Sequence, residues 1–302
     1  MSTTGNILDR KLKPPAKLYQ LDFFVPIAGE TKPRDQQDIM SFPCFSLSKR
    51  KRTKPIVFKS GENWVEIRGN PKYGMATIWD ADVLIYLASY IKHRQSKGYA
   101  IPPVLKVSGY DILTFTGRKT GKTDYRLLRA AMRRLHTTNI TTNIRQGGLL
   151  DHFEFTWIST WRERTKTRID KKTGKEKKVS LGMEIEVPQW FVDGVLNDKL
   201  VLVINPAYFS LKGGFQRWLY RVVRKHCGRQ QQWRISMRGL YTRSGSQGPF
   251  KEFTRLIKEV VEEKGIPDYH LAILEKGNQK YLHTSPSPIL LTGKNVLAVS
   301  PP

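Results

Sequence analysis

The order of predicted elements recurs once along this chain of 302 residues, and the repeat restricts the fold more than any single motif does. In the first copy, apolar residues at helical spacing predict three helices, over residues 79–98, 107–117 and 122–136. Two segments rich in β-branched and aromatic residues, ITTNI and LLDHFEFTWIST, follow on either side of a Gln146-Gly147-Gly148 turn. They predict a hairpin.

The second copy has the same order of elements but little sequence identity to the first. Helices are predicted over residues 215–228, 235–245 and 249–265, and DYHLAILEKGNQKYLHTSP then predicts a strand, a tight turn and a strand. Three helices followed by a hairpin are the order of a winged helix. The repeat therefore predicts an α+β fold, with two tandem winged-helix domains joined by a basic β-hairpin region.

Composition sets the expected boundaries around these two copies. Residues 162–180 are dense in Lys and Arg and predict a hairpin that turns at Lys172-Thr173-Gly174. The N-terminal residues show little periodicity, and we expect them to form an arm that docks through Phe23 and Phe24. The predicted divisions are a partly flexible N-terminal arm (1–55), a first winged-helix domain with the basic hairpin (56–198), a second winged-helix domain (199–285) and a flexible tail (286–302).

A net charge of +26 makes a polyanion the expected partner. The hydrophobic content of 39% is typical of a globular protein. The sequence has no run of about 18 apolar residues, which a membrane span requires, and no apolar signal core near its first residue. Cys44 and Cys227 are far apart, which argues against a disulfide scaffold. These features predict a cytoplasmic protein that binds nucleic acid and no membrane.

The third helix of each copy has one apolar and one basic face at the α-helical period. The residues expected to face the core are Leu128, Ala131, Met132 and Leu135 in the first helix, and Phe253, Leu256, Ile257 and Val260 in the second. The opposite faces carry the DNA-binding candidates Arg126, Arg129 and Arg133, and Lys251, Thr254, Arg255 and Lys258. Matched basic faces at equivalent positions favour two recognition helices for the major groove over two solvated faces.

The sequence GRKTGKT is similar to a nucleotide-binding P-loop, in which four residues separate the two glycines and a buried strand precedes the first. Here three residues separate Gly117 from Gly121, and the segment before Gly117 has helical spacing. We therefore expect no nucleotide site. The turn instead leads into a helix whose positive end favours a DNA phosphate. Its candidate contacts are Lys119, Thr120, Lys122 and Thr123.

Six further candidates lie outside the third helices. The basic hairpin is expected to follow the phosphate backbone without reading sequence, through Lys171, Lys172, Lys177 and Lys178. Arg243 and Ser246 precede the third helix of the second copy and complete the predicted DNA-binding set.

Groups that would carry out catalysis are not evident. The six histidines are scattered singly, whereas nicking enzymes need a metal-binding pair. Asp80 and Asp82 have a spacing that could hold Mg²⁺, but they precede an apolar helix and are better explained as its caps. We expect no enzymatic activity, no cofactor and no metal.

The chain resembles the plasmid replication initiators of the replication initiator protein A family. The resemblance covers about residues 75–285, and its segments are VLIYLASYI, TGRKTGKTDYRLLRAAMRRLHTTNITTNI, FSLKGGFQRWLYRVVRKHCGRQQQWRISMRGLYTRSGS, FKEFTRLIKEV and IPDYHL. It implies tandem winged helices that bind repeated sites in double-stranded origin DNA and open the adjacent AT-rich DNA. It also implies recruitment of the host replicative helicase and other replication proteins, and a homodimer that represses beside a monomer that initiates.

Three other classes fit parts of the sequence. A tandem winged-helix transcriptional repressor would be equally basic, although no ligand-binding or dimerisation domain is apparent. A divergent primase or nicking enzyme would reveal itself by metal-dependent primer synthesis or by a covalent DNA–protein product. A nonspecific architectural protein would lose all preference in competition with unrelated DNA.

Overall fold

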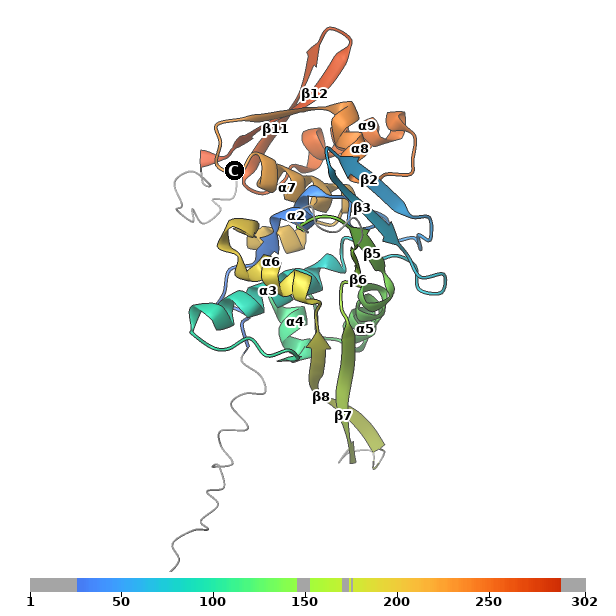
Figure 1. The fold of residues 1–302 in the computed structure, drawn as a ribbon, viewed down its shortest axis with the longest axis vertical. Helices are drawn as coiled ribbons and strands as arrows, with labels where there is room; N and C mark the ends of the chain where they lie inside the picture. Colours follow the sequence, from blue (N-terminus) through green and yellow to red (C-terminus); the bar gives the residue numbers. More distant parts are fainter. Residues whose placement is uncertain (1–25, 146–152, 170–173, 175, 289–302) are drawn as a thin grey trace, which may run out of the picture.

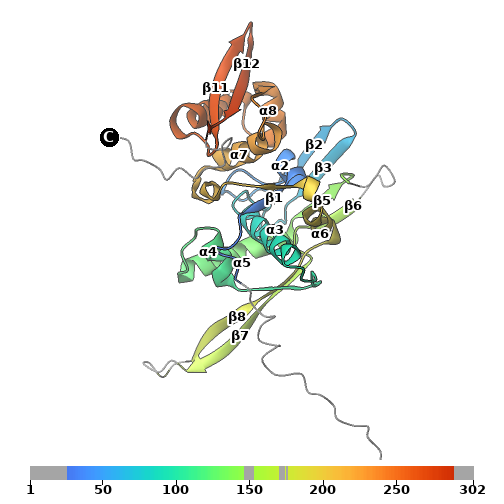
Figure 2. The same cartoon turned by 90° about the vertical axis from the view of Figure 1, so that its left-hand side faces the viewer.

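The computed structural model describes residues 26–145, 153–169, 174 and 176–288. Figure 1 shows a mixed α+β molecule in which two units lie one above the other. Figure 2 shows a β-hairpin projecting from each end of the molecule. None of the described helices is both long and apolar enough to cross a lipid bilayer.

The first unit contains three helices and a three-stranded sheet. Its elements are α3 (Ala81–Ser96), β4 (Leu105–Val107), α4 (Gly109–Phe115), α5 (Lys122–Thr137), β7 (Thr160–Ile169) and β8 (Glu176–Glu186). The sheet is antiparallel with the order β4-β8-β7, and its register places Val107 opposite Met183 and Trp161 opposite Ile185.

The second unit repeats this arrangement. Its elements are α7 (Gly214–His226), β10 (Trp233–Ser236), α8 (Met237–Ser244), α9 (Phe250–Glu259), β11 (Tyr269–Lys276) and β12 (Gln279–Pro286). The sheet order is β10-β12-β11, so in both units the last strand lies in the middle. The short strand also leads into the second helix through a serine cap in both units. Ser108 accepts a hydrogen bond from the N–H of Asp111, and Ser236 accepts one from Gly239.

The strand pairing corrects the predicted repeat. We expected the hairpin that directly follows α5 to complete the first copy and the basic hairpin to join the two domains. Both assignments are wrong, because the hairpin after α5 belongs to a separate four-stranded sheet of order β2-β3-β5-β6. The strands of this sheet are β2 (Ile56–Ser60), β3 (Asn63–Arg68), β5 (Asn139–Thr142) and β6 (Phe153–Thr156). The basic hairpin β7–β8 has the place in the first unit that β11–β12 has in the second.

The described part of the predicted N-terminal arm lies between the two units. β1 (Arg34–Gln36) pairs with β9 (Val201–Val203), and α2 (Gln37–Ser41) contacts α7. The side chain of Ile39 is buried in the first hydrophobic core, and that of its neighbour Met40 in the second. Phe23 and Phe24, which we expected to dock the arm, lie outside the described residues.

Four short helical elements complete the described fold: α6 (Gln189–Leu196), the 3₁₀ turns η1 (Asp198–Leu200) and η2 (Pro206–Ser210), and the π-helical turn η3 (Val260–Lys264).

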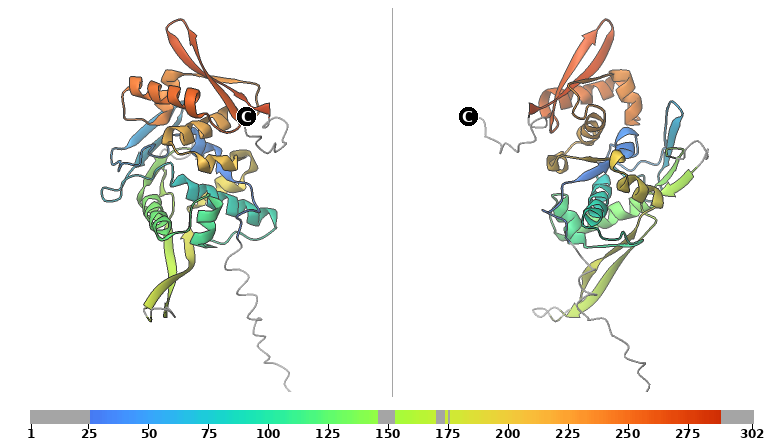
Figure 3. Two further views of the ribbon diagram at one scale, coloured as in Figure 1. Left: turned by 180° about the vertical axis from the view of Figure 1, so that it is seen from behind. Right: turned by 60° about the vertical axis from the view of Figure 1, so that its left-hand side comes forward.

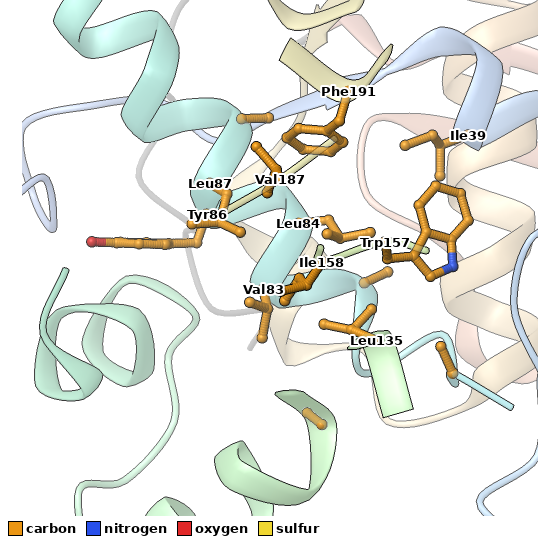
Figure 4. Packing of buried hydrophobic residues seen from close by; sticks show 14 of the residues in the cluster. Ile39, Val83, Leu84, Tyr86, Leu87, Leu135, Trp157, Ile158, Val187 and Phe191 are labelled. Atoms are coloured by element: carbon orange, nitrogen blue, oxygen red, sulfur yellow. The ribbon is translucent and has the colours of Figure 1, made fainter. Parts of the chain in front are cut away.

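The first core surrounds α3, which is buried on all sides over most of its length. Figure 4 shows Val83, Leu84 and Leu87 of this helix in one cluster with Trp157, Ile158 and Phe191. A helix that is apolar all round must be enclosed, whereas an amphipathic helix buries only one stripe. Ile85 of the same helix belongs to the second core, so α3 positions both units relative to each other.

Candidate nucleic-acid interface

The predicted faces of α5 are confirmed. Four apolar side chains are buried in the first core: Leu128, Ala131, Met132 and Leu135. Lys122, Arg126 and Arg133 are exposed, and their side chains form no hydrogen bond or ion pair with any described residue. Three cations without carboxylate partners on one helix form a surface that attracts phosphate.

Arg129, the fourth basic candidate on α5, is joined to the β7–β8 hairpin. Its Nε and Nη2 atoms donate hydrogen bonds to the Glu163 carboxylate at 2.7 and 2.9 Å. These hydrogen bonds lower the pKa of the Glu163 carboxyl. Because a bidentate pair of this kind is directional as well as strong, it holds α5 against β7. Arg129 therefore positions the helix, although 40% of its side chain remains exposed.

The GRKTGKT segment forms a turn between two helices. The predicted helix before it is confirmed as α4, and Gly117 has a φ of 66°, which favours glycine. Lys119, Thr120 and Thr123 are exposed beside Lys122. The Asp124 carboxylate accepts a hydrogen bond from the N–H of Gly121 at 3.2 Å. Part of the positive helix end is therefore already occupied by a side chain of α5 itself.

Asp80 is the N-cap residue of α3, as expected, but its side chain makes no capping hydrogen bond, and both Asp80 and Asp82 are bonded to arginine. Asp80 accepts two hydrogen bonds from Arg134 of α5, both 2.7 Å long. Asp82 accepts from Arg118 and from Arg217 of α7, each at 2.7 Å, and so links the two units. Buried carboxylates need such partners because removing a charge from water is costly. Within the described residues, no group of three or more His, Cys, Asp or Glu side chains could hold a metal ion.

The face of α9 has the predicted register, but its cations are paired differently from those of α5. Phe253, Ile257 and Val260 are buried, and Leu256 is partly buried. Lys251 is exposed and has no partner among the described residues. Arg255 is also exposed, but it donates to the Glu252 carboxylate at 2.7 and 3.0 Å and lies 3.5 Å from Glu259.

The remaining two candidates on α9 lie on either side of Arg255. The Thr254 hydroxyl donates a hydrogen bond to the carbonyl oxygen of Phe250. Lys258 lies near β11, where it helps Lys280 to lower the pKa of the Glu275 carboxyl. Both side chains are partly buried.

A cleft of about 390 Å³ separates α9 from the turn between β11 and β12. Thr254, Arg238, Gln279 and Lys280 are among its lining residues. The Arg238 guanidinium lies 4.2 Å from the centre of the Phe250 ring, which holds this cation beside α9. Sequence reasoning missed Arg238, Gln279 and Lys280, because nothing in their local pattern distinguishes them from solvated residues.

Of the two candidates before α9, Arg243 faces the junction between the units, whereas Ser246 has a local contact in the turn. The Arg243 guanidinium lies 5.9 Å from the centre of the Phe58 ring in β2. The N–H of Ser246 donates to the hydroxyl oxygen of Ser244, in the turn that precedes α9.

Part of the charge of the β7–β8 hairpin is paired across the strands. Arg162 and Arg164 both lie close to the Glu184 carboxylate, at 3.5 and 3.1 Å. Farther along β7, Lys166 and Arg168 are exposed. Lys177 and Lys178 lie in β8, opposite Arg168 and Thr167 in the register. Lys171 and Lys172 lie outside the described residues.

Figures 1 and 3 place α5 and α9 along the same edge of the molecule, with the β2–β3 hairpin between them. Two units that each hold a basic helix beside a small sheet are features of the DNA-binding class of proteins. Within that class, residues 34–271 match the family model described as "Replication initiator protein A". The chain belongs to this family, as the resemblance of its sequence predicts.

Individual relatives agree with this assignment. A protein of Wigglesworthia glossinidia brevipalpis named "Putative replication protein" is 31% identical over 235 residues, which are 77% of this chain and 82% of the relative. The crystal structure of domains 2 and 3 of RctB superimposes with a TM-score of 0.59 at 14% identity, over 83% of this chain and 98% of that one. A second structure, of RctB domains 2–3, gives a TM-score of 0.51 at 13% identity, over 85% and 99% of the two chains. At these identities the likeness to RctB concerns the fold alone.

Proposed function

We propose that this chain is a sequence-specific initiator of plasmid replication that binds repeated sites in duplex origin DNA with two winged-helix domains. Besides the family, one observation supports the proposal: both units place a basic helix beside a sheet of the same strand order. In the proposed complex, α5 and α9 are the recognition helices and enter successive major grooves. The hairpins β7–β8 and β11–β12 are the wings, and the two domains divide between residues 198 and 199.

The two recognition helices have different roles in this proposal. On α5, Lys122, Arg126 and Arg133 bind phosphates, together with Lys119, Thr120 and Thr123 at its entry. Such contacts position the protein without reading sequence. On α9, Arg255 can bind guanine bidentately, and the neighbouring Glu252 can accept from the amino group of cytosine. Lys251, Thr254 and Lys258 border this pair and contact the adjacent backbone.

The basic wing of the first domain supplies further phosphate contacts through Lys171, Lys172, Lys177 and Lys178. Binding at the origin then opens the adjacent AT-rich DNA and recruits the host replicative helicase and other replication proteins. A homodimer would repress, and a monomer would initiate. In this proposal, neither the opening of DNA nor the recruitment of the helicase needs a cofactor bound to this chain.

Footprinting tests the DNA-binding part of the proposal. The purified chain of 302 residues is incubated with the DNA that flanks its gene, in an excess of unrelated duplex. We expect protection of directly repeated sites, each about two helical turns long, beside an AT-rich stretch. Protection of a single palindrome at a promoter would instead support a transcriptional repressor. Equal binding to every duplex would support an architectural protein.

Replication in cells separates initiation from repression. A plasmid that carries the flanking repeats but not the gene should replicate only when the chain is supplied from a second plasmid. The double variant Arg126→Ala/Arg133→Ala should abolish this replication, since it removes two phosphate contacts. Replication that does not depend on the chain would contradict the proposal.

A further inference from the structure

Residues 48–55, the last part of the loop between α2 and β2, lie at the junction of the two units, near α5 and the turn that precedes α9. This loop borders a cleft of about 490 Å³ whose other walls include Leu127 of α5 in the first unit and Phe209 in the second. On its other side, Arg52 of the loop donates a hydrogen bond at 2.7 Å to the carbonyl oxygen of Gly245, in the turn that precedes α9. The loop therefore extends from α5 to the beginning of α9.

Positive charge exceeds negative charge around this loop. Four cationic side chains of the loop are exposed: Lys49, Arg50, Lys51 and Lys54. Asp80 is the acidic residue among those that line the cleft, and its carboxylate is already bonded to Arg134. The side chains of Arg50 and Lys54 have no partner among the described residues. A polyanion would therefore meet uncompensated cations here.

The loop presents these cations from a fixed backbone. The Arg52 guanidinium donates to the carbonyl oxygens of Lys54, Pro55 and Gly245, and burial lowers its pKa to about 10. The carbonyl oxygen of Arg52 in turn accepts from the N–H of Met75 at 2.8 Å. A loop held in this way loses little conformational freedom when it binds a ligand.

Buried ion pairs hold the two units at a fixed distance and orientation. Arg217 of α7 donates to Asp82 of α3 at 2.7 Å, and Arg221 of α7 donates to Asp35 at 2.7 and 3.0 Å. All four side chains are buried, where breaking such a pair is strongly unfavourable. The spacing between α5 and α9 is therefore a fixed property of the chain.

We infer that residues 49–54 form a third DNA contact, which binds the phosphate backbone between the segments read by α5 and α9. The inference rests on the proposed function, because it requires one duplex to contact both helices. A duplex that runs from α5 to α9 passes this loop, which borders both. Phosphate contacts at that point carry no sequence information, but they fix the register of the duplex between the two recognition helices.

The double variant Lys49→Ala/Arg50→Ala tests the inference, since both side chains are exposed and their loss leaves the Arg52 contacts intact. We expect a weaker complex with the footprinted site, and a salt slope of log K lower by up to about 1.8, or about 0.9 for each lost contact. Hydroxyl-radical protection should be lost at the centre of the site and retained at both flanks. The matched control is Lys32→Ala/Lys97→Ala, which removes two exposed lysines near the C-terminal end of α3, at the opposite edge of the molecule in Figure 1.

The outcomes separate this inference from the proposed function. An unchanged salt slope and an unchanged central footprint for Lys49→Ala/Arg50→Ala would overturn the inference. An equal loss of affinity in the control variant would also overturn it, because the effect would then reflect net charge alone. Arg126→Ala/Arg133→Ala is measured in parallel. If that variant also binds like the unmodified chain, the proposed function itself fails.

Discussion

The two proposed recognition helices, α5 and α9, share a register but present different surfaces. The α5 segment has five cationic side chains and one acidic side chain, whereas α9 has three and two. On α5, Arg126 and Arg133 are free of carboxylate partners among the described residues. On α9, Arg255 is held by carboxylates three residues before it and four residues after it. Two helices with apolar and basic residues at equivalent positions can thus differ in function, because neighbouring acidic residues determine which cations are free to bind DNA.

From this difference we propose that the first unit supplies the general affinity for DNA and the second unit the discrimination between sequences. Free cations bind phosphates of any sequence, and their effect depends on salt. A preorganised Arg–Glu pair contributes most binding free energy at a base pair with matching hydrogen-bonding groups. At other base pairs its carboxylate repels the DNA.

The largest effect is expected from the β7–β8 hairpin, the proposed wing of the first domain. Neutralising Lys171, Lys172, Lys177 and Lys178 together should weaken binding to every duplex and lower the salt slope by up to about 0.9 for each lost contact. The measurement is a fluorescence-anisotropy titration at several salt concentrations, with specific and unrelated duplexes. A salt slope equal to that of the unmodified chain would show that the hairpin does not contact DNA.

A smaller loss is expected from α5. Arg126→Ala/Arg133→Ala should lower the salt slope by up to about 1.8, since two phosphate contacts are removed. Binding to specific and to unrelated duplexes should weaken to the same extent. Both side chains are exposed, so the variant should fold normally, which a thermal melt checks. Loss of specific binding alone would mean that α5 reads bases.

Arg255→Ala should instead reduce the preference of the protein for its cognate DNA sequence. Loss of one bidentate contact should cost about 1–3 kcal/mol at a single base position and relax the preference there. Competition between the cognate site and singly substituted sites measures this preference. The control is Lys251→Ala on the same helix, which should weaken binding to all of these sites to a similar extent.

The smallest effect is expected from Lys122→Ala at the entry to α5, because Asp124 already occupies part of the helix end. Affinity for specific and unrelated DNA should fall about equally, by the equivalent of one phosphate contact. Equilibrium dialysis with ATP provides the contrast with a P-loop lysine. Tight ATP binding by the unmodified chain, lost in the variant while DNA affinity is intact, would contradict our interpretation of GRKTGKT.

The elements that depend on a local sequence pattern could be predicted from the sequence. The three helices of each unit, the buried stripe of α5 and the helix before Gly117 all follow from apolar spacing, and the structure confirms them. Pairing between distant segments could not be read in this way. The β-branched residues of β5 and β6 predict strands, but not that they join β3 instead of β8.

The same limit applies to the candidate site. Helical spacing places Arg129 near the basic face, but its partner Glu163 lies 34 residues away on another element. Asp80 has the position of a helix cap and Asp82 lies in the first turn of α3, and only the folded chain shows that arginines from α5, the α4–α5 turn and α7 surround them. Long-range ion pairs leave no periodic pattern in a sequence, so these contacts could not be predicted.

The ratio of specific to nonspecific affinity tests the division between α5 and α9 most directly. It is measured at one fixed salt concentration for the unmodified chain, Arg126→Ala/Arg133→Ala and Arg255→Ala. We expect the α5 variant to keep the ratio of the unmodified chain while both of its affinities fall, and Arg255→Ala to lower the ratio roughly 5- to 150-fold, the equivalent of about 1–3 kcal/mol. A ratio that falls in the α5 variant and stays unchanged in Arg255→Ala would contradict this division.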